Sequence, residues 1–564
     1  MSSTYDLESL NLPRLAGLPL KLFSEAVENP VTGKALLGTL QKNAGVDKLR
    51  ALELDEPPTY YPLHPPSDSG EPLRDASQWF ESRRKAESRS VPFATVRDYA
   101  EAYRSGAITP ENVAEAVLNA IAESDKGDKP LRSFIAIDRD DVMRQAREST
   151  KRFRDGRPLG PLDGVPVAVK DEVDMTPYGT TVGTSFLGKE PARIDATEVA
   201  RMRAAGAVLL GKTNMHEIGI SVTGLNPHHG VARNPYAPDH FTGGSSSGSA
   251  AAVAAGFCPV AIGADGGGSI RIPSAFCGVV GLKGTFGRVS GFGAAPLDWT
   301  VGHLGPIAAT AEDAAIAYAI MAGPDPKDPL SLRHPEISLE GFDDLNLDGL
   351  KLGVYVPWFE HADGETVQIC KSALENLKSA GAEVVEITIP ELDPARLAHA
   401  LIILSEMASA MDRYYAEHRR DFGLEARVSL ALARSFTARD YVQAQRVRTR
   451  SLRQFMEALS QVDVIVTPTT ALPAPEIPAD ALPDGESNLS LVTEIMRFAF
   501  PANLTGLPAI TFPVGYTKAG LPVGLQVMGR PWSEALLLRI DHTAEQFVEQ
   551  RKPVIFINPV EGVS

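Results

Sequence analysis

The sequence predicts an α/β protein in which helices cover one large, mostly parallel or mixed β-sheet. Short apolar runs alternate with segments of helical periodicity along most of the chain, which is typical of layered α/β folds. The chain also has enough apolar content for a large buried core, since 43% of its 564 residues are hydrophobic and 22% are charged. We therefore expect a globular protein rather than a disordered one.

The first 55 residues predict an N-terminal helical arm. Apolar residues recur at helical spacing from Leu18 to Val27 and again from Val31 to Leu40, and Pro30 separates the two runs. The apolar face of such an amphipathic pair needs a partner. We expect it to pack on the body of the protein, to form a lid, or to contact a membrane or another protein. Residues 56–94 begin with a non-periodic stretch rich in proline and predict a linker.

Regular alternation begins near Thr95 and predicts one large domain over residues 95–555. Its first helix should be capped by Thr109, with Pro110 in the first turn. We expect strands at the apolar runs 134–137, 165–169, 208–210, 260–264, 279–282, 384–389, 464–466 and 509–512. Helical spacing lies between most of these runs, at 141–153, 196–205, 311–321, 365–380 and 437–460.

Charge and cysteine content argue against several classes of protein. A formal net charge of -16 and a pI near 5.3 speak against a nucleic-acid-binding surface. Cys258, Cys277 and Cys370 lack metal-ligand spacing and cannot all pair, so we expect no metal site and no disulfide scaffold. The sequence has no signal-peptide pattern and no run of about 18 apolar residues. We therefore expect an intracellular protein, cytoplasmic or peripherally membrane-associated, and not secreted.

A glycine-rich loop that ends in a serine is the first candidate site. Gly266, Gly267 and Gly268 follow an apolar, strand-like run and lead directly into Ser269. Glycine permits a substrate carbonyl to approach the backbone closely, and successive N–H groups can then stabilise an oxyanion. The serine would be the attacking group. Taken alone, the segment is more typical of a glycine-rich turn between strands.

Two further segments bear on this serine. Lys170 ends the apolar run 165–169, and a lysine held in a dry site loses its proton easily and can act as a base. Ser245 lies in a glycine-serine turn, 243–249, that runs directly into an alanine-rich helix. A flexible linker does not usually sit between periodic elements, and the turn lacks the lysine ending of a phosphate-binding loop. Each segment is ambiguous when considered alone.

Together these motifs resemble the amidase signature family over residues 95 to about 550. The resemblance implies that Ser269 is the nucleophile, Ser245 the proton relay and Lys170 the base. It also implies an oxyanion hole formed by Gly266, Gly267, Gly268 and Ser269 together with Ser245, and a structural charge pair between Asp265 and Arg271. Other positions of the family pattern are present as well, among them Ile270, Pro273, Ser274, Cys277, Gly278, Gly281, Leu282 and Lys283. No cofactor is implied.

Finer details resemble the plant-type fatty acid amide hydrolases within that family. They are the segments 15–23, 99–105 and 529–535 and the serine at position 247. This resemblance implies hydrolysis of fatty acid amides such as N-acylethanolamines to free fatty acid and amine through an acyl-enzyme. It also implies a homodimer and an N-terminal helix pair that covers an acyl channel. The partner expected is a small-molecule or lipid amide, with no nucleic acid and with peripheral membrane contact as an option.

Several alternatives share parts of these patterns. A broader amidase that acts on aryl acylamides, N-acyl homoserine lactones or carbamates would use the same triad, and so would the A subunit of a tRNA-dependent amidotransferase. A binding protein without activity would not need Lys170, Ser245 and Ser269 together. Two other catalytic sites are possible from the residue types present. One is a Ser-His-Asp site that uses His216, His228 or His229, and the other is a thiol enzyme that uses Cys277 or Cys258.

Overall fold

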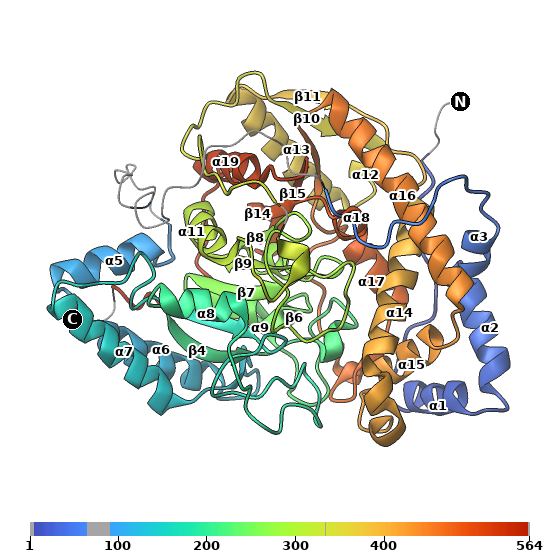
Figure 1. The fold of residues 1–564 in the computed structure, drawn as a ribbon, viewed down its shortest axis with the longest axis horizontal. Coiled ribbons are helices and arrows are strands. Elements are labelled where there is room, and N and C mark those ends of the chain that lie inside the picture. Colours follow the sequence, from blue (N-terminus) through green and yellow to red (C-terminus); the bar gives the residue numbers. More distant parts are fainter. Residues whose placement is uncertain (1–4, 65–79, 81–90, 333, 562–564) are drawn as a thin grey trace.

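An eleven-stranded mixed β-sheet forms the centre of the protein (Figure 1). The computed structural model describes residues 5–64, 80, 91–332 and 334–561. The strand order is β11-β10-β12-β15-β14-β8-β9-β7-β3-β4-β2, with parallel pairs at β11-β10-β12 and β7-β3-β4 and antiparallel pairs elsewhere. The strands are β2 (Phe134–Ala136), β3 (Pro166–Lys170), β4 (Val208–Thr213), β7 (Val260–Ala264), β8 (Val280–Lys283), β9 (Leu304–Ala308), β10 (Lys351–Val354), β11 (Glu383–Glu386), β12 (Val464–Pro468), β14 (Ala509–Tyr516) and β15 (Pro522–Gly529).

All eight predicted strands are present in this sheet, but the sequence did not reveal three of its members. β9 and β15 contain glycine and proline, which interrupt the apolar runs used to recognise a strand. Pro306 nevertheless lies in the middle of the sheet, opposite Ile262 of β7. β10 begins with an exposed lysine and has only three buried residues. Two small two-stranded sheets complete the strands: β1 (Leu15–Ala16) with β13 (Glu486–Ser487), and β5 (Arg233–Asn234) with β6 (Ala237–Phe241).

Helices cover the sheet, which confirms the predicted fold class. The predicted helices are all found, and Thr109 caps its helix by accepting the N–H of Asn112. The long helix after residue 391 was not predicted, because it is apolar on more than one side and shows little helical periodicity. The helices of this body are α5 (Val96–Ser105), α6 (Pro110–Ser124), α7 (Arg139–Arg154), α8 (Thr197–Ala204), α9 (Ser247–Ala254), α10 (Arg271–Phe276), α11 (Ala311–Met321), α12 (Val356–Phe359), α13 (Gly364–Ser379), α14 (Leu392–His418), α15 (Leu424–Ala433), α16 (Ala438–Gln461), α17 (Leu489–Met496), α18 (Phe500–Thr505) and α19 (Glu534–Ala544).

The N-terminal arm packs against one end of the body. Its helices α1 (Gly17–Glu28), α2 (Gly33–Asn43) and α3 (Val46–Arg50) lie beside α14, α15 and α16, as Figure 1 shows in blue and orange. Pro30 falls in the break between α1 and α2, as predicted. Arg427 of α15 holds the arm through Glu28, with an N–O distance of 2.6 Å. The outer face keeps three apolar side chains in solvent: Leu18, Leu22 and Val31 are 66%, 57% and 85% exposed.

The linker prediction is testable only in part. Residues 65–79 and 81–90 of the predicted 56–94 linker lie outside the described residues. Residues 56–64 have no regular secondary structure. They lie against α16, where Arg448 donates to the carbonyl of Tyr60 at 2.6 Å. Across the described parts of the chain, no helix combines the length and apolar character needed to cross a bilayer.

Candidate active site

The glycine-rich loop that ends in Ser269 connects the central strand β7 to the short helix α10. Glycines in the neighbouring strands let this segment lie close to the sheet: a methyl group on Gly281 of β8 would be 2.4 Å from Ser274 Oγ, and one on Gly263 of β7 would be 3.0 Å from Ile270 Cγ1. Gly268 has a φ of 118°, a conformation that other residues rarely adopt. These glycines therefore let Ser269 lie in a closely packed loop just beyond the carboxyl end of β7.

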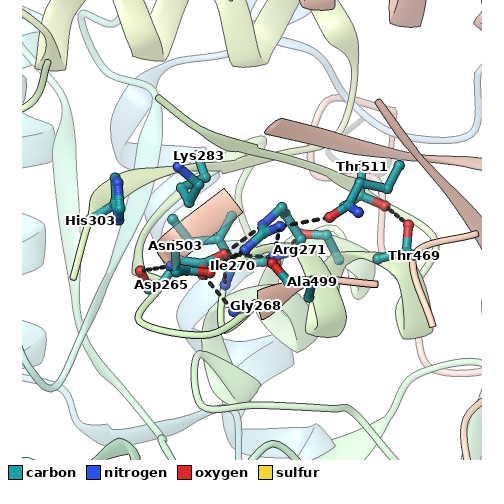
Figure 2. Close-up of polar contacts among 12 residues, drawn as sticks. Asp265, Gly268, Ile270, Arg271, Lys283, His303, Thr469, Ala499, Asn503 and Thr511 are labelled. Atoms are coloured by element: carbon teal, nitrogen blue, oxygen red, sulfur yellow. Dashed lines mark hydrogen bonds and ion pairs between the residues drawn. The ribbon is translucent and has the colours of Figure 1, made fainter. Parts of the chain in front are cut away.

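A buried network around the ion pair of Asp265 and Arg271 holds the loop in place (Figure 2). Arg271 contacts both carboxylate oxygens of Asp265, each at 3.0 Å, and donates to Asn503 and Gln526 at 2.6 Å. Asn503 donates in turn to the backbone and side-chain oxygens of Asp265, at 2.8 and 2.9 Å. Both charged residues are completely buried. The predicted structural pair is thus part of a network that ties the loop to residues from α18 and β15.

This framework keeps Asp265 ionised. Burial by itself would raise the pKa of Asp265, but the charge and hydrogen bonds of Arg271, followed by the charge of Lys283 and the amide of Asn503, lower it far below the ordinary value. The carboxylate accepts backbone N–H groups of the loop as well, from Gly268 at 2.6 Å and Ile270 at 3.1 Å. The anion therefore organises the loop by accepting its N–H groups.

The donors that remain for an oxyanion differ from the predicted set in one position. The N–H of Gly268 is occupied by Asp265, so Gly268 supports the loop and does not offer its N–H to a substrate. The N–H groups of Gly266, Gly267 and Ser269 have no acceptor among the described residues. The structure thus narrows the backbone part of the predicted oxyanion hole to these three groups.

Lys170 and Ser245 meet beside the loop. Lys170 is the last residue of β3, and its Nζ donates to Ser245 Oγ at 2.8 Å and to the carbonyl of Ala264 at 3.2 Å. A third partner is Glu172, whose Oε2 lies 2.7 Å from Nζ. Ser245 and Lys170 are almost completely buried. The hydroxyl of Ser269 has no hydrogen-bond partner among the described side chains and backbone groups, which leaves it free to react.

The three predicted catalytic residues line one cavity of about 270 Å³. Its walls also carry Asp265 and Gly266 of the loop, and two carboxyl groups that the sequence did not single out, Glu172 and Asp298. The apolar side chains in its walls include Phe286, Val289, Leu297, Leu330, Ile403 and Met407. None of the residues that line this cavity belongs to the N-terminal arm, so the lid stays a prediction.

His399 is a further residue that sequence reasoning missed. It comes from α14, and its Nε2 lies 2.8 Å from the carbonyl oxygen of Gly266. Burial lowers the pKa of His399 to about 4, so the ring is neutral at neutral pH and its proton must sit on Nε2 to make this bond. The carbonyl of Gly266 and the N–H of Gly267 belong to one rigid peptide plane. His399 therefore fixes the direction of the Gly267 N–H.

The alternative chemistries find no assembled site. His216 lies 3.2 Å from Glu425, His228 lies 2.7 Å from Glu217, and neither of them nor His229 lines the cavity with Ser269. Cys258 and Cys277 are buried, and burial raises the pKa of Cys258 to about 12, which disfavours a reactive thiolate. In the described parts of the chain, no cluster of three or more His, Cys, Asp or Glu could hold a metal ion.

Of the three site residues that sequence reasoning missed, only Glu172 could have been found from its neighbours in the sequence. It follows Lys170 by two positions and continues an acidic stretch after the strand, which places a carboxylate within reach of the lysine. Asp298 and His399 carry no such signal, since loop and helix packing bring them to the cavity from distant parts of the chain.

Comparisons with known proteins identify the family of this chain. Residues 115–538 match the protein family described as Amidase. The chain is 41% identical to a fatty acid amide hydrolase of Medicago truncatula over 585 residues, which cover 98% of this chain and 96% of the relative. It is 36% identical to the A subunit of the glutamyl-tRNA(Gln) amidotransferase of Koribacter versatilis over 464 residues, covering 76% of this chain and 95% of that relative.

A solved structure shares the fold. The peptide amidase from Stenotrophomonas maltophilia superposes with a TM-score of 0.70 at 31% sequence identity, covering 82% of this chain and 98% of that one. The likeness thus extends from sequence to three-dimensional arrangement.

Proposed function

The chain belongs to the amidase signature family and is an amide-cleaving hydrolase, and on this premise we propose that it hydrolyses fatty acid amides such as N-acylethanolamines. The nucleophile in this proposal is Ser269, with Ser245 as proton relay and Lys170 as base. The observation that carries the assignment of these roles is the 2.8 Å bond between Lys170 and Ser245 in the wall of the same cavity as the unpartnered hydroxyl of Ser269.

The mechanism follows from these contacts. Neutral Lys170 takes a proton by way of Ser245 while Ser269 attacks the amide carbonyl, and the N–H groups of Gly266, Gly267 and Ser269 receive the oxyanion. Glu172, 2.7 Å from the lysine nitrogen, stabilises the ammonium that forms. The same relay returns the proton to the leaving amine. Water then hydrolyses the acyl-enzyme and releases the free fatty acid.

The preference for acyl chains rests on two observations. The likeness to the plant hydrolase includes the N-terminal arm, whereas the amidotransferase relative matches only about three quarters of the chain. The cavity that Ser269 lines also has apolar side chains in its walls, among them Ile403 and Met407. Each methylene group buried there would contribute about 0.8 kcal/mol to binding. A long acyl chain would therefore bind more tightly than a short one.

Replacement of the nucleophile tests the proposal. We expect Ser269→Ala to lower kcat for an N-acylethanolamine by at least about 10³-fold, because the acyl-enzyme can no longer form. The matched control is Ser247→Ala, which removes a buried hydroxyl that bonds the carbonyl of Asn214 outside the cavity. Release of fatty acid and ethanolamine is measured by mass spectrometry, together with labelling by a fluorophosphonate. Near-normal turnover by Ser269→Ala, or a label on another residue, contradicts the assignment.

A broader amidase is the second candidate, because the polar end of the cavity does not select a head group by itself. The same triad would cleave aryl acylamides, N-acyl homoserine lactones or carbamates. A panel of N-acyl amides that varies chain length and amine independently separates these options. A component of a tRNA-dependent amidotransferase would differ from both, because the isolated chain would leave free acyl amides unhydrolysed.

The outer face of the arm supports a contact surface. Leu18, Leu22 and Val31 project into solvent from α1 and the turn that follows it. We propose that this face forms the homodimer or peripheral membrane contact, since exposed apolar groups of this size are typical of such surfaces.

A further inference from the structure

Asp298 is a cavity residue that the mechanism so far does not use. Its carboxyl group fits between two glycines: a methyl group on Gly266 would lie 1.9 Å from Oδ2, and one on Gly302 would lie 2.2 Å from Oδ1. Gly266 belongs to the loop that offers N–H groups to the oxyanion, and Asp298 lines the same cavity as Ser269. The carboxyl group therefore touches the oxyanion loop on the side that faces the substrate.

The structure gives this carboxyl group no partner. Its side chain has no hydrogen bond or ion pair with any of the described residues. The N–H groups that follow it in the chain, those of Trp299 and Thr300, donate instead to Glu406 of α14, at 2.7 and 2.9 Å. Arg448 also contacts Thr300 and not Asp298. A polar group that remains unsatisfied in a cavity wall is available to a ligand.

The charges around Asp298 favour its protonated form. Burial raises the pKa of Asp298 well above its ordinary value, and the carboxylates of Glu172, Glu406 and Asp265 add to this effect, while Lys170 opposes it. Lys170 is the neutral base in the proposed mechanism, and its ammonium form is bound to Glu172 at 2.7 Å. The raised pKa thus favours the protonated form of Asp298, which can donate a hydrogen bond, as protonated aspartic acids do in other enzymes.

We propose that Asp298 donates a hydrogen bond from its protonated carboxyl group to the acyl carbonyl oxygen that gains charge when Ser269 attacks. In this role Asp298 complements the N–H groups of Gly266, Gly267 and Ser269 as a side-chain member of the oxyanion hole. The inference rests on the proposed function, because it assumes an acyl transfer to Ser269. Asp298 keeps its proton in this step, and its hydrogen bond strengthens as the carbonyl oxygen becomes negative.

Two substitutions separate donation from mere packing. Asn can donate from its amide but cannot ionise, whereas Ala can do neither. We expect Asp298→Ala to lower kcat by about 10²- to 10³-fold with KM changed only a few-fold, and Asp298→Asn to stay within about 10-fold of wild type. The full-length variants are compared on a fatty acyl ethanolamide and on a fatty acyl anilide, which lacks the hydroxyl of the head group.

The pH profile supplies a readout that a structural role would not change. Asp298 is neutral below its raised pKa and ionises as pH rises, so the wild-type kcat should fall on the alkaline side, and Asp298→Asn should lack this fall. The matched control is Asp313→Asn, since Asp313 is also a buried acid with a raised pKa but bonds Val96 away from the cavity. This control should keep the alkaline fall of the wild type.

Specific outcomes would overturn the inference. It is wrong if Asp298→Asn is as inactive as Asp298→Ala, if the alkaline fall persists in Asp298→Asn, or if the loss appears only with the hydroxyl-bearing substrate. If the wild-type chain hydrolyses neither amide, the proposed function fails and this inference fails with it. Turnover by wild type combined with any of the first three results overturns the inference alone.

Discussion

Two aspartates beside the same glycine loop, the buried Asp265 and the partly exposed Asp298, differ in the partners of their carboxyl groups. Arg271, Asn503 and two loop N–H groups hold the carboxylate of Asp265. Asp298 stands at the cavity, where it faces carboxylates and has no donor among the described residues. The pKa of the first is strongly lowered and that of the second is strongly raised. Desolvation raises the pKa of both groups, so their partners decide the direction of the net shift.

The difference separates two tasks of the loop. The side toward the protein interior is fully satisfied and rigid, and therefore fixes where the backbone donors point. The side toward the cavity keeps groups unsatisfied, among them the hydroxyl of Ser269 and the carboxyl of Asp298, which can then bind substrate. Such preorganisation allows a site to stabilise developing charge without moving at the moment of reaction.

The largest expected effect comes from breaking the satisfied side. Arg271→Met should lower the free energy of unfolding by about 3–5 kcal/mol, because it leaves the Asp265 carboxylate buried without its cation. Activity should fall as well, since the loop loses its anchor to Asn503 and Gln526. Urea unfolding monitored by tryptophan fluorescence measures the stability.

The control for this substitution removes an exposed arginine. Arg144 contacts Asp141 at 2.5 Å and Glu148 at 2.9 Å on the surface of α7, where each such pair contributes under about 1 kcal/mol. Arg144→Met should therefore unfold near the wild-type midpoint. An Arg271→Met protein as stable as this control would mean that Asp265 does not need Arg271, and the contrast between the two aspartates would lose its basis.

A smaller effect is expected at His399, which acts on the loop through one carbonyl. His399→Phe should lower kcat by about 10- to 100-fold with KM nearly unchanged, because the Gly266–Gly267 peptide is no longer held in place. His399→Gln can still donate and should recover most of the activity. Since the pKa of His399 is about 4, its titration should leave no limb in the wild-type profile above pH 5.

Phe500 supplies the matched control, because its ring packs near His399, with centroids 6.1 Å apart, but does not contact Gly266. Phe500→Leu should change kcat by less than about three-fold while disturbing the same region. A wild-type kcat in His399→Phe would show that the loop keeps its geometry without this bond.

The same contrast explains which parts of the site the sequence could predict. Lys170, Ser245 and the glycine loop are local patterns next to strands, and residues from all three line one cavity. Asp298 and His399 leave no local pattern, because their position depends on contacts such as the one between His399 and Gly266, 133 residues apart. Gly268 was assigned a free N–H because sequence spacing does not show which donors a buried carboxylate will occupy.

For the fold, the predictable elements are those whose apolar residues form uninterrupted or periodic runs. Strand β7 and helix α11 were recognised within their observed bounds, as such patterns allow. Strand β9 was not predicted because Pro306 interrupts its apolar run, although Pro306 is paired with Ile262 of β7. Pairing between strands distant in sequence cannot be read from either strand alone.

The smallest expected effect is a gain in stability at Asp298. Its folded pKa is raised, so wild type loses stability as pH rises from the unfolded value of about 3.9 toward the folded one. Asn does not ionise, and Asp298→Asn should therefore unfold at a higher urea concentration than wild type at pH 8, with the difference vanishing near pH 4. Asp265→Asn should show the reverse: a loss at pH 8 that shrinks as acid protonates the wild-type carboxylate. If Asp298→Asn were the less stable protein at pH 8, Asp298 would be an ionised and well-paired group like Asp265, and the two sides of the loop would not differ in the way their contacts indicate.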